Sequence, residues 1–256
     1  MKLRVENISL WFSGLRVIEE FNFEVDEPKI YAIIGPNGAG KTSVMNCIFG
    51  FYKPGRGNII VNDVRINRLR PHERAKLGLS RLFQNSELFT HLTVLENVLL
   101  GRHIYFDYGP LSAFWHYGKA RREEIRHRER VEEIMGFLGI EKIRKELVAN
   151  LPFGLKKKVE LARALAMDPK MLFLDEPTSG MNQEEKEDIV RLILSTKQSR
   201  NIPVIFVEHD MNVVMDISDR VTVINFGRKI AEGPPRQVQE DPDVIEAYLG
   251  RQRAWS

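Results

Sequence analysis

Short apolar runs that recur between polar stretches predict a sheet whose strands alternate with helices. Met171–Leu174 and Val204–Val207 are apolar throughout, and Tyr31–Ile34 has the same character nearer the N-terminus. Strands that are buried on both faces give continuous apolar runs, whereas strands with one wet face alternate. These segments therefore predict a parallel sheet that helices cover on both faces.

Alternating segments predict antiparallel pairs beside that sheet. Leu3–Phe12 and Phe21–Val25 alternate apolar and polar residues, and Asn58–Val61 and Val64–Ile66 flank a short Asn-Asp turn. Such alternation around a turn is typical of hairpins. Near the C-terminus, residues 221–225 and 229–231 predict another hairpin.

Helical periodicity dominates the middle of the chain. Val94–Leu100 and Lys119–Leu138 predict two helices, and the mixed-sign charges of the second are typical of a solvated face. Lys156–Met167 and Glu184–Ser195 predict helices between the apolar strands. We therefore predict an α/β fold in which residues 1–84 and 157–256 form the core with an antiparallel β flap, and residues 85–156 form an inserted helical subdomain.

Residues 35–42 match the pattern GxxxxGK[ST] and lie between the strand Tyr31–Ile34 and a predicted helix, Ser43–Phe49. Backbone N–H groups of a glycine turn and a helix N-terminus form a cradle for phosphates. The lysine supplies a positive charge, and the threonine hydroxyl is suited to ligate Mg²⁺. We predict that ATP or a related nucleoside triphosphate is held by Gly35, Pro36, Asn37, Gly38, Ala39, Gly40, Lys41, Thr42 and Ser43.

Two adjacent carboxylates, Asp175 and Glu176, follow the apolar strand Met171–Leu174. Burying them without partners would be costly, so their position calls for a chemical role. Side chains alternate along a strand, and the two therefore point in different directions. We assign Asp175 to the magnesium shell and Glu176 to the γ-phosphate, as the base for the attacking water.

Composition excludes several classes of protein. The chain has 256 residues and a net charge of +3, too small to indicate nucleic-acid binding by itself. No apolar run approaches the ~18 residues that indicate a membrane span, and the N-terminus lacks a signal-peptide core. The single cysteine, Cys47, cannot form an internal disulfide, which fits a small core residue in a reducing cytosolic setting.

Taken together, the phosphate loop and the run Asp-Glu-Pro-Thr-Ser-Gly at 175–180 resemble the ATP-binding-cassette (ABC) ATPase family. The resemblance covers nearly the whole chain and implies a P-loop NTPase (RecA-like) core. It implies that Gln84 coordinates Mg²⁺ and orients water, that His209 senses the γ-phosphate, and that Phe12 stacks on adenine. Residues 179–182 then correspond to a loop between subunits. Glutamine and histidine side chains are chemically suited to those roles.

The signature motif of that family, usually Leu-Ser-Gly-Gly-Gln, departs from the pattern in this chain. Its equivalent is Leu-Pro-Phe-Gly-Leu at 151–155, so Pro152 replaces the hydroxyl residue. Proline offers neither an O–H nor a backbone N–H. Phe153 and Gly154 remain candidates for contact with the nucleotide. The three lysines at 156–158 oppose the helix dipole, and we expect them to be solvated, although a nearby polyphosphate would also account for them.

Residues 208–220 and 241–250, together with the long helical insertion and Phe153, resemble the branched-chain amino acid importer branch. That resemblance implies an ATP-hydrolysing subunit at the cytoplasmic face of the membrane. Its implied partners are a second ABC ATPase subunit, two transmembrane permease subunits and, indirectly, a periplasmic or extracellular solute-binding protein. A heterodimer is favoured over a homodimer. The solute is left open among branched-chain amino acids, urea, amides and aromatic acids.

Two other functions would use the same phosphate loop. A soluble ABC mechanoenzyme acting on nucleic acid or ribosomes would normally add a coiled-coil arm, a second cassette or a strongly basic surface. A small-molecule kinase would not need Gln84, Glu176 and His209 around one γ-phosphate. We therefore expect no nucleic-acid partner.

Overall fold

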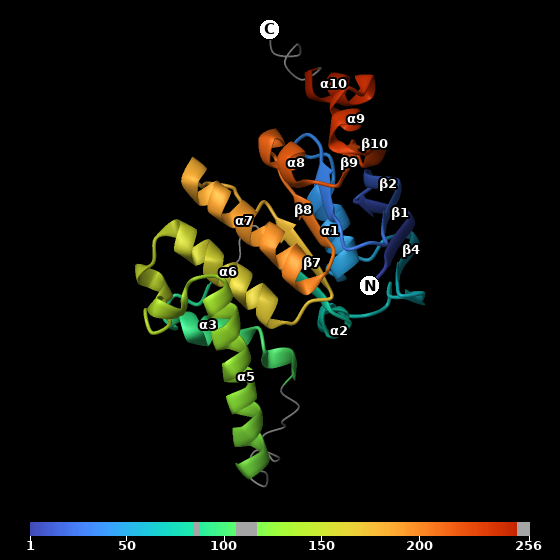
Figure 1. Ribbon diagram of the computed structural model, residues 1–256. Helices are drawn as coiled ribbons and strands as arrows, with labels where there is room; N and C mark the ends of the chain where they lie inside the picture. Colours follow the sequence, from blue (N-terminus) through green and yellow to red (C-terminus); the bar gives the residue numbers. More distant parts are fainter. Residues whose placement is uncertain (84–87, 106–116, 250–256) are drawn as a thin grey trace.

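The computed structural model describes residues 1–83, 88–105 and 117–249, and contains two sheets with helices packed around them (Figure 1). The strands are β1 (Leu3–Phe12), β2 (Leu15–Val25), β3 (Ile30–Ile34), β4 (Arg56–Val61), β5 (Val64–Arg65), β6 (Leu79–Leu82), β7 (Met171–Asp175), β8 (Val204–Val207), β9 (Arg220–Asn225) and β10 (Arg228–Gly233).

The larger sheet has the strand order β10-β9-β3-β8-β7-β6. All its neighbouring pairs are parallel except β10 with β9. This confirms the predicted α/β fold with a parallel sheet and the hairpin at its edge. Because β3, β7 and β8 run in one direction, their carboxyl ends meet at the same edge, where the predicted site residues follow them.

Alternate residues of the central strands enter two different hydrophobic clusters. Ile30, Ala32 and Ile34 of β3 belong to one cluster, whereas Tyr31 and Ile33 belong to the other. The strands β7 and β8 divide in the same way. Both faces are therefore buried, which is the reason these strands are apolar throughout.

The helices are α1 (Lys41–Phe49), α2 (Pro71–Lys76), α3 (Val94–Leu100), α5 (Tyr117–Phe137), α6 (Phe153–Ala166), α7 (Gln183–Arg200), α8 (Met211–Ile217), α9 (Pro235–Gln239) and α10 (Pro242–Leu249), with 3₁₀ turns η1 (His103–Tyr105), η2 (Glu141–Ile143) and η3 (Val148–Asn150). Figure 1 shows α5 extending away from the sheets, while α10 lies beyond β10. Within the described residues no helix has the length and apolar character needed to cross a membrane.

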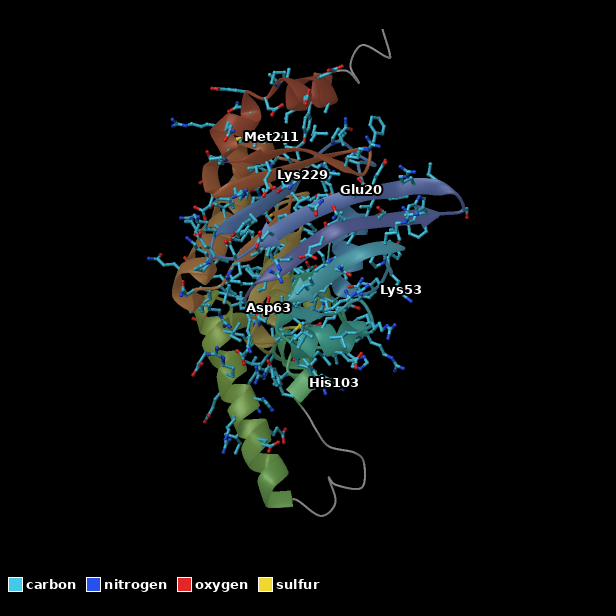
Figure 2. The ribbon with its side chains drawn as sticks, turned by 90° about the vertical axis from the view of Figure 1, so that its right-hand side faces the viewer. Glu20, Lys53, Asp63, His103, Met211 and Lys229 are labelled. Atoms are coloured by element: carbon cyan, nitrogen blue, oxygen red, sulfur yellow. The ribbon has the colours of Figure 1, made fainter. Side chains whose placement is uncertain are left out.

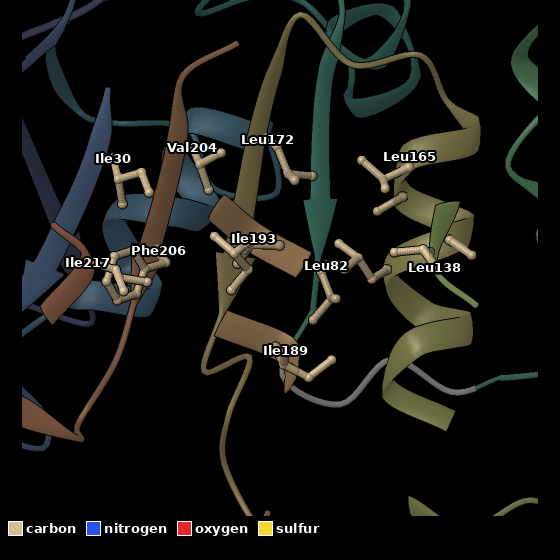
Figure 3. Packing of buried hydrophobic residues seen from close by; sticks show 14 of the residues in the cluster. Ile30, Leu82, Leu138, Leu165, Leu172, Ile189, Ile193, Val204, Phe206 and Ile217 are labelled. Atoms are coloured by element: carbon tan, nitrogen blue, oxygen red, sulfur yellow. The ribbon is translucent and has the colours of Figure 1, made fainter. Parts of the chain in front are cut away.

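Helices α6, α7 and α8 share a cluster with one face of the central sheet. Figure 3 shows Ile189 and Ile193 of α7 beside Leu82 and Leu172 of the sheet. Truncating a buried isoleucine such as Ile193 to alanine typically costs about 2–5 kcal/mol. The same cluster includes residues of α3 and α5, so the predicted helical insertion and the central sheet share one continuous hydrophobic core. The division of the chain at residues 84 and 156 stays a prediction.

Helix α1 and the smaller antiparallel sheet share the second cluster, on the other face of the central sheet. That smaller sheet has the order β2-β1-β4-β5, and its strands face the viewer in Figure 2. Asn62 and Asp63, between β4 and β5, both have positive φ, at 46° and 65°. A type I′ turn requires positive φ at both central residues, and these residue types tolerate it. The predicted hairpin is thereby confirmed.

Strand β2 and helix α6 begin at least three residues earlier than the sequence pattern predicts. Strand β2 begins at Leu15 and not at Phe21, because it pairs with the end of β1 through Phe12 and Leu15 despite irregular register. Helix α6 begins at Phe153 and not at Lys156, after Pro152 as its N-cap. Proline is tolerated at a helix start because the missing N–H would have no helical partner there.

Candidate nucleotide-binding site

The phosphate loop leads from β3 into α1, and its glycines are required by close backbone approaches. A Cβ atom at Gly35 would lie 2.0 Å from the Ile224 carbonyl oxygen, and one at Gly40 would lie 2.9 Å from that of Val17. Gly40 also has a φ of 108° as the N-cap of α1. Only glycine adopts this backbone without strain. The loop therefore holds its N–H groups in a shape fixed by neighbouring strands.

Lys41 folds back over the loop and is only 6% exposed. Its Nζ atom donates to the carbonyl oxygens of Gly35 at 2.7 Å and Pro36 at 3.1 Å. A buried ammonium group favours a nearby anion, because burial weakens its hydration. The geometry therefore suits a lysine that contacts phosphate.

A cavity of about 600 Å³ opens beside the loop. It is lined by Val17, residues 37–43, Glu176 and His209. The tertiary structure thus brings together most of the predicted phosphate loop, the predicted base and the predicted sensor. Val17 was not predicted as a site residue, since an aliphatic side chain carries no chemical signal of nucleotide binding.

Glu176 and His209 are brought into contact by pairing of β7 with β8. Asp175 is in register with Val207, and the Glu176 amide donates to the Val207 carbonyl at 2.8 Å. The residues after these strands then meet, with His209 Nε2 2.5 Å from Glu176 Oε1. Glu176 has a φ of 49°, a left-handed conformation that is costly for a residue with a side chain.

Glu208 supports this arrangement and was missed as a site residue. It is 3% exposed, and its Oε2 accepts the backbone N–H of His209 at 2.8 Å. Its Oε1 accepts both the backbone N–H and the hydroxyl of Thr178. The carboxylate therefore joins the loop after β7 to the loop after β8. A signal was present, because Glu208 is an acid directly after an apolar strand, as Asp175 and Glu176 are.

Asp175 has different surroundings from Glu176. Its Oδ2 accepts from Arg81 Nη2 at 2.6 Å, in a pair whose side chains are 2% and 3% exposed. Its Oδ1 is buried without a hydrogen-bond partner. The two adjacent carboxylates therefore do point toward different environments, as strand alternation predicts.

A magnesium ion fits the chemistry of these residues. No cluster of three or more metal-ligating His, Cys, Asp or Glu side chains occurs in the described parts of the chain. Magnesium in nucleotide sites usually takes one or two carboxylates, phosphate oxygens and waters. Thr42 lines the cavity, and Asp175, which is not among the lining residues, has a buried oxygen without a partner. Gln84, the other predicted ligand and candidate catalytic residue, lies outside the described residues.

Several residues predicted to contact the nucleotide are not among those that line the cavity in a single chain. Phe12 packs edge-on against Tyr52, with ring centroids 5.0 Å apart. The Phe153 ring lies 3.5 Å from where a Cβ at Gly180 would be, and a Cβ at Gly154 would lie 2.5 Å from Glu185 Oε1. The signature residues thus neighbour the predicted inter-subunit loop and not the phosphate loop. Their nucleotide contacts stay predictions.

The expectation that the lysines at 156–158 are solvated is wrong for Lys157. This residue is 6% exposed and its Nζ lies 2.9 Å from Glu160 Oε2. The ammonium also lies 5.6 Å from the centroid of the Phe153 ring. Burial raises the pKa of Glu160, although Lys157 opposes this. Helix α6 turns this position toward its own Glu160, one turn along, so the charge is paired and not solvated.

The C-terminal helix also reaches the site. The backbone of Gly35 is a hydrogen-bonding partner of the Tyr248 side chain, while burial raises the pKa of that phenol. Tyr248 belongs to α10, which packs on β10. The sequence did not predict this contact, because a single aromatic residue in a terminal helix has no distinctive pattern.

Comparisons with known proteins identify the family of this chain. The family described as "ABC transporter" matches residues 18–179, and "Branched-chain amino acid ATP-binding cassette transporter" matches residues 228–254. The high-affinity branched-chain amino acid transport ATP-binding proteins BraF of Pseudomonas aeruginosa and LivG of Escherichia coli are each 37% identical over 248 residues, covering 97% of both chains.

Among solved structures, an ATP-binding cassette of an ABC transporter in its ADP conformation superimposes with a TM-score of 0.84. Its sequence is 32% identical, and the match covers 98% of this chain and 99% of that one. This likeness confirms the predicted fold class. The chain therefore belongs to the ABC transporter family of ATP-binding subunits, in the branch of the branched-chain amino acid cassettes.

Proposed function

We propose that this chain is the ATP-hydrolysing subunit of an importer for branched-chain amino acids or related small polar or organic solutes. The observation that carries the proposal is the single cavity shared by the phosphate loop, Glu176 and His209. Membership of the ABC family makes the chain an ATPase. The importer role rests on its similarity to BraF and LivG along nearly the whole chain.

The reaction is the attack of water on the γ-phosphorus of ATP, which breaks the bond to the β-phosphate oxygen. Glu176, which lines the cavity, accepts the proton of that water. Lys41 and the loop N–H groups stabilise the phosphate charge. A magnesium ion, when bound, would neutralise phosphate charge, and Thr42, Asp175 and Gln84 are the residues proposed to hold it. The products are ADP, phosphate and a proton.

The positions of Phe153 and Gly154 support a site completed by a second ATPase subunit. Within one chain they lie against Gly180 and Glu185, outside the lining of the cavity. Phe153 is 48% exposed, and its aromatic ring is therefore accessible to a partner. We propose that these residues contact ATP held by the phosphate loop of a second, related subunit, in a heterodimer.

The proposed assembly includes two transmembrane permease subunits, fed by an external solute-binding protein. The chain would then lie on the cytoplasmic face of the membrane as a peripheral subunit. Coupling to transport would come from closure of the two ATPase subunits around ATP. Nucleic acid has no part in this function.

The test is reconstitution of the chain with its cognate ATPase, permease and binding proteins in liposomes. We expect ATP-dependent uptake of radiolabelled leucine, isoleucine or valine, with urea, amides and aromatic acids compared as competitors. The Glu176→Gln complex is the control for hydrolysis. ATPase activity that responds to nucleic acid or ribosomes, without association with permease subunits, would contradict the proposal.

A further inference from the structure

Arg81 forms a buried ion pair with the carboxylate proposed to face magnesium. It lies in β6, which pairs with β7, and its Nη2 donates to Asp175 Oδ2 at 2.6 Å. The residue as a whole is 8% exposed. An ion pair that is buried this deeply needs good geometry to offset the lost hydration of both groups.

Three other contacts fix the plane of the Arg81 guanidinium. Its Nη1 donates to Asn46 Oδ1 at 2.8 Å, and Asn46 lies in α1, directly after the phosphate loop. The rings of Phe49 and Phe83 have their centroids 5.6 Å and 4.6 Å from the guanidinium carbon. Arginine combines forked donors with a planar cation that stacks on aromatic rings, and lysine has neither property. Arg81 thus joins β7, α1 and the end of β6.

The pair leaves the two oxygens of Asp175 in different states. Oδ2 accepts from Arg81, whereas Oδ1 is buried and has no hydrogen-bond partner. Arg81 Nε is also buried and has no partner. A buried oxygen without a partner is costly unless a ligand satisfies it. Arg81 therefore sets which carboxylate oxygen is left for a ligand.

On the basis of the proposed function, we propose that Arg81 is a positioning residue for magnesium. It holds Asp175 in the orientation that offers Oδ1 to the metal shell, and through Asn46 it ties that carboxylate to the helix that begins at the phosphate loop. Arg81 itself contacts neither metal nor nucleotide. Outer-shell partners of this kind typically change metal affinity by about 10–100-fold when altered.

The test replaces Arg81 with lysine, which keeps the positive charge and removes the forked N–H donors of the guanidinium group. A labelled, non-hydrolysable ATP analogue is titrated with the full-length protein, first in EDTA and then at increasing Mg²⁺. We expect unchanged affinity in EDTA and a Mg²⁺ half-saturation concentration raised by roughly tenfold or more. Manganese titrated under the same conditions and followed by its electron paramagnetic resonance signal should show the same loss.

Arg102→Lys is the matched control. Arg102 is also 8% exposed and paired with an aspartate, but that aspartate, Asp168, follows α6 and is not among the residues proposed to hold magnesium. This variant should show the wild-type Mg²⁺ dependence. An unshifted Mg²⁺ curve for Arg81→Lys would overturn the inference, as would an equal loss of affinity with and without Mg²⁺.

If Arg81→Lys does not fold, as judged by thermal unfolding, Asn46→Ala serves as the second variant. It removes one bond of the guanidinium without leaving a charge unpaired, so we expect a smaller shift in the same direction. No shift in Asn46→Ala would then overturn the inference. If nucleotide binding by the wild-type protein did not depend on Mg²⁺, that result would overturn the proposed magnesium site and this inference with it. A normal wild-type response beside unshifted variants would overturn the inference alone.

Discussion

His209 Nε2 lies 2.5 Å from Glu176 Oε1, although the two residues are 33 positions apart in the chain. An ionised carboxylate only accepts hydrogen bonds, so the imidazole must carry its proton on Nε2 when Glu176 is ionised. The same N–H cannot bond fully to Glu176 and to a γ-phosphate at once. The contact therefore gives His209 a way to report whether a phosphate is present, and gives Glu176 a fixed position when it is absent.

Glu176→Gln should bind ATP and fail to hydrolyse it. Glutamine keeps the shape and hydrogen-bonding capacity of the side chain but cannot accept the proton of the attacking water. Loss of a general base typically lowers the rate about 10²–10⁴-fold. The measurement is phosphate release in the assembled complex, with ATP affinity measured in parallel. Glu184→Gln, at an exposed position in the first turn of α7, is the control. Near-wild-type turnover in Glu176→Gln would show that another group is the base.

His209→Ala should lower turnover while leaving ATP affinity almost unchanged. Lys41 and the loop amides hold the phosphates, whereas His209 contacts the catalytic carboxylate and is 42% exposed at its side chain. Equilibrium binding of labelled ATP separates affinity from turnover. Lys41→Ala is the opposing comparison, because it should weaken binding itself. A large loss of affinity with intact turnover in His209→Ala would contradict the sensor role.

Pro152→Ser should speed the ATP site to which this chain contributes its signature motif. Pro152 is the N-cap of α6, with φ −56° and ψ 156°, a backbone conformation that serine also adopts. The new hydroxyl could bond a phosphate, and bonds to charged groups are worth ~1.5–3 kcal/mol. If that bond forms in the transition state, ATP hydrolysis at this site becomes about 10–100-fold faster.

The signature comparison needs the heterodimeric complex and a second variant. Pro152→Ala removes the proline without adding a hydroxyl, so it separates the two effects. Glu176→Gln in this chain should abolish more of the ATPase activity than the matching change in a partner with a regular signature. Equal losses, together with an unchanged rate for Pro152→Ser, would show that the hydroxyl is dispensable.

Asp168→Asn should destabilise the fold at neutral pH by up to about 1 kcal/mol, because Asp168 is 35% exposed at its side chain and solvent screening keeps such ion pairs near ~0.2–1 kcal/mol. Asp168 follows α6 and pairs with Arg102, Arg130 and Arg200. Burial alone would raise its pKa, but hydrogen bonds from Arg102 and Arg130 outweigh burial, and the pKa lies below its ordinary value of 3.8. Asparagine tolerates the positive φ of 43° at this position.

The sign of the pH effect follows from that lowered pKa. The unfolded chain binds a proton at Asp168 more readily than the folded chain does. The stabilisation is therefore present above pH ~3.8 and is lost as the pH falls through the folded value. Urea unfolding of the wild type and Asp168→Asn, repeated as the pH is lowered from 7 toward 3, should show the difference shrinking. A constant difference over that range would contradict this assignment.

Local chemistry determined much of this protein from the sequence alone. The bounds of Leu3–Phe12, Val94–Leu100 and Val204–Val207 agree with the structure, because strand and helix periods are properties of neighbouring residues. The phosphate loop was equally plain, since its glycines, lysine and threonine have a spacing imposed by the loop itself. Family membership followed from several such motifs in one chain.

Only the tertiary structure decided which distant side chains meet. Nothing in their spacing shows that Arg81 pairs with Asp175, 94 residues away, or that Tyr248 reaches Gly35. Sheet order and helix packing set those contacts, and both depend on the whole chain. The same holds for Lys157, whose charge was expected in solvent and is buried beside Glu160. Charged residues are usually exposed, because burying a charge costs free energy unless the fold places a partner beside it.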